Sequence, residues 1–279
     1  MQESIEHTKE QISNKLQELT SHKYIKLTTR GNNAIKAALK LFHSVLIPSE
    51  GGWISYQKLP KKLKLNLEEV NCLDSKIDLI DLKNKLQQNK YECFLYQNPS
   101  GYFAKNNQEE IYNLCKEHNC KVILDASGSL GTNMCNGNFA DFIIASFGTW
   151  KLVEAGGGGF ISTNNEQHFN KIIQETKEIE DEKLESINKA LNNLGNRIKF
   201  LSNLRQETIE KLNKQIPNAN IIHKEDKGFV IVIKFENVIE KENLEHFCKQ
   251  NNLEYTICPR YIRLNQNAIS IELKRKVQQ

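Results

Sequence analysis

Short apolar runs alternate with amphipathic segments over the first 165 residues of the chain. Apolar positions at helical spacing, together with helix-start signals, predict helices over residues 3–19, 34–42, 79–86 and 107–119. Brief, mainly apolar runs predict strands over residues 43–48, 65–70, 92–96, 121–125 and 141–147. Strands that are apolar along most of their length are buried on both faces, which favours a sheet covered by helices on each side.

We therefore expect an α/β fold, a three-layer αβα sandwich around a mixed, mostly parallel sheet. Ligands bind to such sheets at the carboxyl ends of the strands. Asn98, Asp125 and Ser146 stand at or just after the ends of three predicted strands. The pattern thus predicts that three polar side chains converge on one edge of the sheet.

The pattern changes after this segment. Apolar residues at three and four residue spacings between 184 and 201 predict one long helix or two shorter ones. Strands over 228–235 and near 261–264, with a helix around 243–251, indicate a small α+β unit. We divide the chain into an N-terminal helix (1–24), a large domain (25–165), and a helical crossover with a small C-terminal domain (166–279).

Composition excludes some classes of protein. The 279 residues carry 38 Lys and Arg against 34 Asp and Glu, and no apolar stretch is long enough to span a membrane. The first residues lack the apolar core of a secretory signal, so we expect a cytoplasmic protein. The seven cysteines form no C-x-x-C pair, so no metal site is expected. A net charge of +4 without a recognition motif makes a nucleic-acid partner unlikely.

Lys151 is the first candidate for chemistry. It follows the strand over 141–147 and precedes four consecutive glycines, Gly156 to Gly159. Its amine would stand at the ligand edge, beside a backbone that a bulky group can approach closely. A plain glycine loop with a solvated lysine is the alternative.

Asp125 adds a second element. A carboxylate at the end of a strand can hold a pyridine nitrogen in its protonated form. A lysine Schiff base with an aspartate partner to the ring nitrogen is the pairing that pyridoxal phosphate uses. The alternative is that Asp125 only caps the next turn.

Two segments resemble a known family. KVILDASGSLGT (121–132) and SFGTWKLVEAGGGGF (146–160) are similar to the cofactor-binding segments of fold type I pyridoxal-phosphate enzymes, and most closely to the DegT/DnrJ/EryC1/StrS aminotransferases. The shared features are Ser-Phe, three residues, Lys, and then a glycine run. The resemblance covers roughly residues 25–165 and implies the fold of aspartate aminotransferase.

The resemblance also implies roles for individual residues. Lys151 would form the Schiff base and move the substrate proton, and Asp125 would pair with the pyridine nitrogen. Ser146 would bind the cofactor phosphate. The phosphate would also meet the start of the helix over 34–42, at Gly31, Asn32 and Asn33, where free amides and the helix dipole favour an anion.

For four further residues, the resemblance implies a role in binding, and a purely structural role is the alternative. Trp53 would stack on the pyridine ring, or pack in the core. Asn98, in Asn-Pro-Ser-Gly, would bond the cofactor's phenolic oxygen, or only form a turn. Arg263 and Arg260 would bind a substrate carboxylate from a C-terminal strand, or form salt bridges.

The expected function is that of an aminotransferase acting on an amino acid or an amino- or keto-sugar-like substrate, with a small-molecule amino donor and acceptor. The resemblance implies a homodimer. A lyase or cysteine desulfurase-like enzyme of the same fold, with Cys258 or Cys135 as its thiol, and an inactive cofactor-binding relative are the alternatives. Gly128 departs from the family, which usually has Gln three residues after the Asp, and the C-terminal domain is short.

Overall fold

The computed structural model describes residues 2–277. Its centre is a seven-stranded sheet in the order β1-β9-β8-β7-β6-β2-β3. In that order the strands are Tyr24–Thr28, Gly159–Thr163, Phe142–Ser146, Lys121–Asp125, Cys93–Gln97, Ser44–Pro48 and Asn66–Val70. Strand β9 runs antiparallel to both β1 and β8, and the remaining pairs of this sheet are parallel. The prediction of a mixed, mostly parallel sheet is confirmed.

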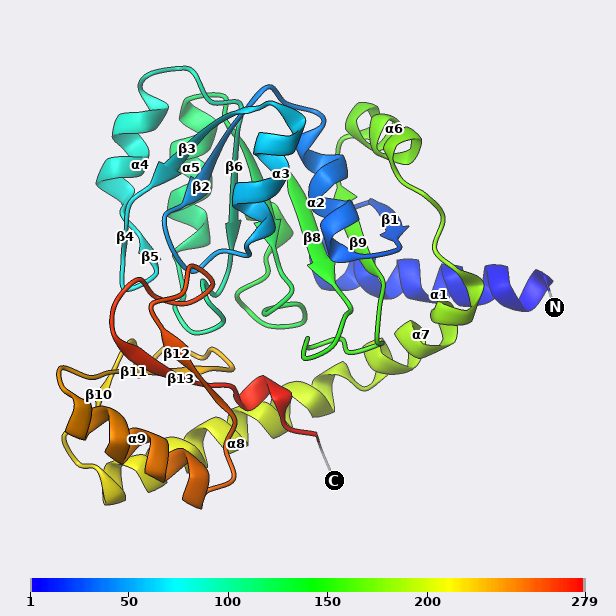
Figure 1. Ribbon diagram of the computed structural model, residues 1–279. Coiled ribbons are helices and arrows are strands. Elements are labelled where there is room, and N and C mark those ends of the chain that lie inside the picture. The colour runs from blue at the N-terminus through cyan, green and yellow to red at the C-terminus, as the bar shows by residue number, and fades with distance from the viewer. Residues whose placement is uncertain (1, 278–279) are drawn as a thin grey trace.

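Helices cover both faces of this sheet (Figure 1). Along β7, Val122 and Leu124 belong to one apolar cluster and Ile123 to another, so both faces are buried. The first cluster includes residues of α1 (Gln2–Thr20), α4 (Leu79–Leu86), α5 (Gln108–Glu117) and α7 (Leu184–Asn192). The second includes residues of α2 (Gly31–Leu39), α3 (Ser55–Leu63) and α6 (Glu166–Glu175). The molecule therefore has the expected three layers.

A second, antiparallel sheet lies on the side to which β6 and β8 point (Figure 1). Its order is β10-β11-β13-β12, with strands Asn220–Ile221, Ile231–Lys234, Ala268–Ile271 and Tyr255–Cys258. It packs with α8 (Leu194–Gln215) and α9 (Val238–Gln250) around its own apolar cluster. A two-stranded hairpin, β4 (Cys72–Leu73) and β5 (Lys76–Ile77), completes the strands described.

One predicted strand is wrong. Residues 261–264 form a turn between β12 and β13, so Arg260 and Arg263 stand on a loop. Pro259 lacks the amide proton that a strand would need, and the amide of Arg260 closes a tight loop on the Leu264 carbonyl at 2.7 Å. The segment from 184 forms two helices, α7 and α8, one of the two forms expected.

No helix among the described residues has the length and apolarity that a membrane crossing requires.

Candidate functional site

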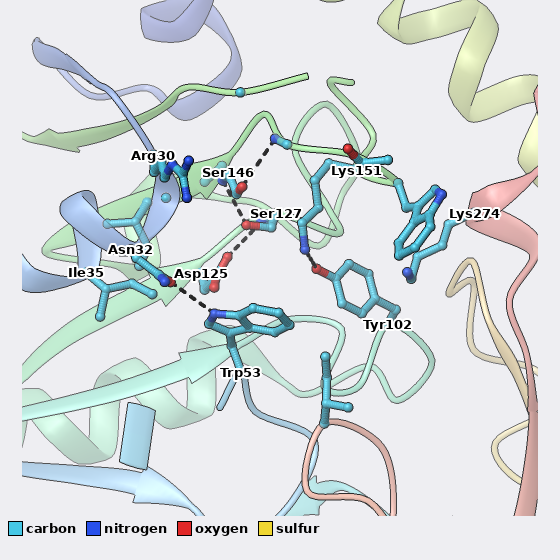
Figure 2. Close-up of a pocket in the computed structure, with 18 of the residues that line it drawn as sticks. Arg30, Asn32, Ile35, Trp53, Tyr102, Asp125, Ser127, Ser146, Lys151 and Lys274 are labelled. Carbon is cyan, nitrogen blue, oxygen red and sulfur yellow. Dashed lines mark hydrogen bonds between the residues drawn. The ribbon is translucent and has the colours of Figure 1, made fainter. Parts of the chain in front are cut away.

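A cavity of about 550 Å³ lies at the carboxyl ends of β7 and β8 (Figure 2). Loops of the large sheet form most of its wall, and the loop before β13 and the residues after it close one side. The cavity brings together most of the residues predicted from the sequence: Gly31, Asn32, Trp53, Asp125, Ser146, Lys151, Arg260 and Arg263. Asn33 and Asn98 do not line it.

Asp125 ends β7 and is only 5% exposed. Its Oδ2 accepts a hydrogen bond of 2.7 Å from the hydroxyl of Tyr56, and its Oδ1 accepts one of 2.9 Å from the amide of Ser127. Burial and the Asp125 charge raise the pKa of Tyr56, so this phenol stays a proton donor. Nothing in the sequence around Tyr56 indicated this role, because α3 was not predicted.

Lys151 projects into the middle of the cavity. Its Nζ donates a hydrogen bond to the hydroxyl of Tyr102 and lies 5.2 Å from the ring centroid of Trp53 (Figure 2). The preceding residue, Trp150, has a φ of 64°, which places the lysine on a sharp turn after β8. The amine is thus held between two aromatic side chains.

Tyr102 occupies the space beside Gly128. A Cβ atom at Gly128 would lie 2.7 Å from Cδ1 of Tyr102, so a side chain at residue 128 would displace the phenol ring. Tyr102 itself has a φ of 66°, an unfavourable conformation for a bulky residue, and is 3% exposed. The family usually has a Gln at the position of Gly128. In this chain the space for that side chain is filled by the ring of Tyr102, from the turn after β6.

The start of α2 meets the end of β8 at one end of the cavity. A Cβ atom at Gly31 would stand 2.6 Å from Cβ of Ser146, and one at Gly159 would stand 2.9 Å from the Gly31 amide nitrogen. The helix therefore begins in direct contact with the strands, with its first amides at the cavity wall. The Ser146 hydroxyl accepts from the Gly148 amide at 3.3 Å.

The side chains of Asn32 and Trp53 are joined by a hydrogen bond. The Oδ1 atom of Asn32 accepts hydrogen bonds of 3.0 Å from Trp53 Nε1 and of 3.0 Å from the Ser55 hydroxyl. Trp53 therefore lies with a fixed orientation at the cavity, and the Asn32 side chain positions it. Asn33 turns away and its side chain bonds Thr29.

Asn98 is 1% exposed and its side chain is used within the fold. Its Nδ2 donates to the Met134 carbonyl at 3.2 Å, and its Oδ1 accepts from the Asn106 amide at 3.0 Å. Both ends of the Asn98 amide thus have a partner within the fold, and the cofactor contact that the resemblance implies for it stays a prediction.

Arg263 forms an ion pair with a buried carboxylate, that of Glu272. The guanidinium Nη2 lies 2.7 and 3.0 Å from the two oxygens of Glu272, its Nε donates to Ser270, and both charged residues are at most 3% exposed. The charges of Arg263, Lys274 and Arg275 outweigh burial and lower the pKa of Glu272 to about 2. Arg260 is exposed at the cavity rim.

Lys274 and Arg275 are site residues that the sequence analysis did not identify, because no motif surrounds them. Lys274 is 7% exposed, and its Nζ lies 5.0 Å from the ring centroid of Tyr102. Burial, with the nearby charges of Arg263 and Lys151, lowers its pKa to about 8. Arg275 stacks its guanidinium 4.4 Å from the ring centroid of Trp150.

The two candidate thiols do not reach the cavity. Cys135 and Cys258 are 7% and 2% exposed, and neither lines it. Burial raises the pKa of both thiols, that of Cys135 to about 12. Neither cysteine has the environment of a reactive thiolate.

Comparison with known proteins agrees with this geometry. Residues 100–208 match the model of the DegT/DnrJ/EryC1/StrS aminotransferase family. A curated relative, the UDP-4-amino-4,6-dideoxy-N-acetyl-beta-L-altrosamine transaminase of Campylobacter jejuni, is 33% identical over 112 residues, which are 30% of its length and 35% of this chain.

Solved structures resemble the whole chain. A DegT DnrJ EryC1 StrS aminotransferase from Brucella abortus superposes with a TM-score of 0.77 over 95% of this chain and 84% of its own, at 14% identity. The histidinol-phosphate aminotransferase from Clostridium acetobutylicum gives a TM-score of 0.76 over 96% and 83%, at 19% identity. The resemblance predicted from the two motifs is confirmed. Residues 100–208 carry a DegT/DnrJ/EryC1/StrS aminotransferase family segment, and the chain as a whole has the fold of the type I aminotransferases.

Proposed function

We propose that the protein is an aminotransferase that uses pyridoxal 5'-phosphate. One observation carries the proposal: Lys151 and Asp125, the two groups that this chemistry needs, face a single cavity whose wall includes the start of a helix. The family match over residues 100–208 and the similar transaminase support it.

The residues present fit the cofactor. The amides at Gly31 and the hydroxyl of Ser146 offer donors for a phosphate, and their close approach leaves no room for a side chain at residue 31. Asp125 accepts hydrogen bonds from Tyr56 and Ser127, which fix its carboxylate at the cavity, where it would pair with a protonated ring nitrogen. Trp53, fixed by Asn32, offers a flat apolar face.

When bound, the cofactor supplies an electron sink that makes the Cα–H bond of a substrate amine acidic. Lys151 Nζ would form the Schiff base with the cofactor, and, once a substrate amine has displaced it, would act as the base that takes the Cα proton. The Tyr102 hydroxyl accepts a hydrogen bond from Nζ and so keeps this amine directed into the cavity. Tyr56 holds Asp125 in place, and the half-buried ring of Trp53 covers part of the cavity wall.

The substrate class follows from the family and its curated relative rather than from any single contact. We infer an amino-sugar or keto-sugar-like substrate, or an amino acid, with a small-molecule amino donor. We also propose that the protein works as a homodimer in the cytoplasm. The buried thiols of Cys135 and Cys258 give no support to a desulfurase.

Reduction with borohydride tests the proposal. Purified protein supplied with pyridoxal phosphate should turn yellow, borohydride should bleach it, and peptide mapping should locate the added mass on Lys151. Lys151→Ala should lose this adduct, whereas Lys105→Ala, which changes an exposed lysine outside the cavity, should keep it. A protein that takes up no cofactor, or an adduct on another lysine, would overturn the proposal.

Incubation with single amino acids then identifies the reaction. Glutamate should convert the bound cofactor to pyridoxamine phosphate, with the absorbance maximum moving to shorter wavelength. Release of sulfide from cysteine, or of pyruvate from serine, would instead identify a desulfurase or a lyase.

A further inference from the structure

The cavity has a positive side that the cofactor does not need. Its lining contains six cationic side chains and two carboxylates: Arg30, Lys151, Arg260, Arg263, Lys274 and Arg275 against Asp125 and Glu272. In the view of Figure 2, Arg30 lies near Ser146, and Lys274 lies beyond Lys151 and Tyr102. Positive charge therefore remains on the side away from the start of α2.

Glu272 does not neutralise this side. It is held at 2.7 Å by Arg263, and Lys274 Nζ reaches the same oxygen only at 3.3 Å. Arg275 pairs at 2.8 Å with Glu254, an exposed residue, and its buried Nε has no hydrogen-bond partner among residues 2–277. Two buried cations thus share one carboxylate, and a third lies beside them.

Of the two buried cations, Lys274 has fewer partners within the protein than Arg263. Arg263 donates hydrogen bonds to Glu272, Ser270 and the Ile262 carbonyl. Lys274 Nζ has one carboxylate partner among the described residues. Burying a cation with incomplete compensation is costly, and the lowered pKa of Lys274 reflects that cost. An anionic ligand that binds beside such a cation would offset this cost.

We propose that Lys274 binds an anionic group of the substrate, a carboxylate or a phosphate, while the substrate amine reacts at Lys151. Arg275 adds positive charge beside it, and Arg263 holds Glu272 rather than the substrate. The Nζ atoms of Lys151 and Lys274 lie 4.9 and 5.0 Å from the Tyr102 centroid, so they are within about 10 Å of each other. This spacing suits an anion a few bonds from the amine. The inference rests on the proposed function.

Three small amines that attack the cofactor at Lys151 test this subsite. Methoxyamine is neutral, aminooxyacetate carries a carboxylate, and aminooxymethylphosphonate carries a phosphonate. The rate of each reaction with the cofactor-loaded protein is followed by absorbance and divided by its rate with free pyridoxal phosphate. We expect this ratio to be at least about tenfold higher for one of the anionic probes than for methoxyamine, as one charge-assisted hydrogen bond would give. The preferred probe tells whether a carboxylate or a phosphate binds.

Variants connect the preference to Lys274. Lys274→Gln should abolish the preference for the anionic probe, while Lys276→Gln, two residues away and outside the cavity lining, should retain it. Equal ratios for all probes in the unaltered protein, or a preference that survives in Lys274→Gln, would overturn the inference while leaving the proposed function standing. Failure of every probe to react would refute the proposed function and the subsite with it.

Discussion

Lys274 and Arg263 show how two neighbouring buried cations differ in their effect on stability. Arg263 donates hydrogen bonds through all three guanidinium nitrogens and is compensated by Glu272, whereas Lys274 has a pKa lowered to about 8. A lysine pKa that is lower in the folded chain than in the unfolded one means that folding disfavours the charged form. The cost is complete below about pH 8 and disappears as pH rises through the ordinary lysine pKa of 10.5.

Lys274→Met should therefore stabilise the fold at pH 7. The lowering of the Lys274 pKa from 10.5 to about 8 corresponds to a gain on the order of 3 kcal/mol in the free energy of unfolding. This gain should vanish near pH 10.5. Arg263→Met should instead destabilise by about 3 to 5 kcal/mol, since it leaves Glu272 buried with a weaker partner. Urea unfolding of both variants at pH 7 and 10 measures this. A Lys274→Met protein less stable than the unaltered one at pH 7 would contradict the argument.

At the scale of elements, the contact between α2 and β8 places the start of a helix at the cavity wall, where we propose that the cofactor phosphate binds. Gly31 begins the helix against Ser146, so the first helical amides lie at the cavity wall. A side chain at residue 31 would meet the Ser146 side chain and move the helix start away from the strand.

Gly31→Ala should weaken pyridoxal phosphate binding by roughly tenfold or more, because a change of 1.4 kcal/mol in the phosphate contacts has that effect. Gly195→Ala is the matched control, since this helical glycine lies outside the cavity lining and its Cβ would meet nothing within 4 Å beyond its own helix. Fluorescence titration of the cofactor-free proteins gives both dissociation constants. Equal affinity in the two variants would show that the helix start does not hold the phosphate.

The central strands β6, β7 and β8 were predictable because they are mainly apolar and buried, and each ends in a polar residue, such as Asp125, at the ligand edge. Strands β1 and β9, at one side of the sheet, were not predicted from the sequence. The loop over 259–267 was not predictable in the same way. Tyr261, Ile262 and Leu264 look like a strand in the sequence, and only Pro259 and the contacts with the large sheet turn them into a loop.

Individual site residues were predictable where a motif surrounds them. Lys151 and Asp125 stand in motifs that have a fixed order along the chain, so the sequence alone identified them as candidates. Tyr56, Tyr102 and Lys274 are not part of such a motif. Tyr102 and Lys274 line the cavity, and Tyr56 is brought to it by its hydrogen bond to Asp125. Their roles depend on which surfaces meet in three dimensions, and a local pattern does not contain that information.

At the scale of the whole molecule, the positive side of the cavity depends on how the small sheet contacts the large one. Glu50 joins the two: its Oε1 accepts from the Ser75 amide and its Oε2 from the Asn265 amide, both at 2.7 Å, and it is 4% exposed. Close by, the Tyr261 hydroxyl donates to the Pro48 carbonyl at 3.0 Å. These bonds hold the loop that precedes β13 and, through it, Arg263 and Lys274.

Glu50→Ala should therefore affect the two sides of the cavity unequally. Loss of two hydrogen bonds to a buried carboxylate should reduce the free energy of unfolding by about 3 kcal/mol. Affinity for pyridoxal phosphate and the methoxyamine rate should change little, because the large sheet carries Lys151 and Asp125, but the preference for an anionic probe should fall. Glu69→Gln, an exposed position on β3, should leave all of these values unchanged. If Glu50→Ala loses cofactor affinity in parallel with the anion preference, the two sides are not held independently, and the small sheet also shapes the cofactor end of the cavity.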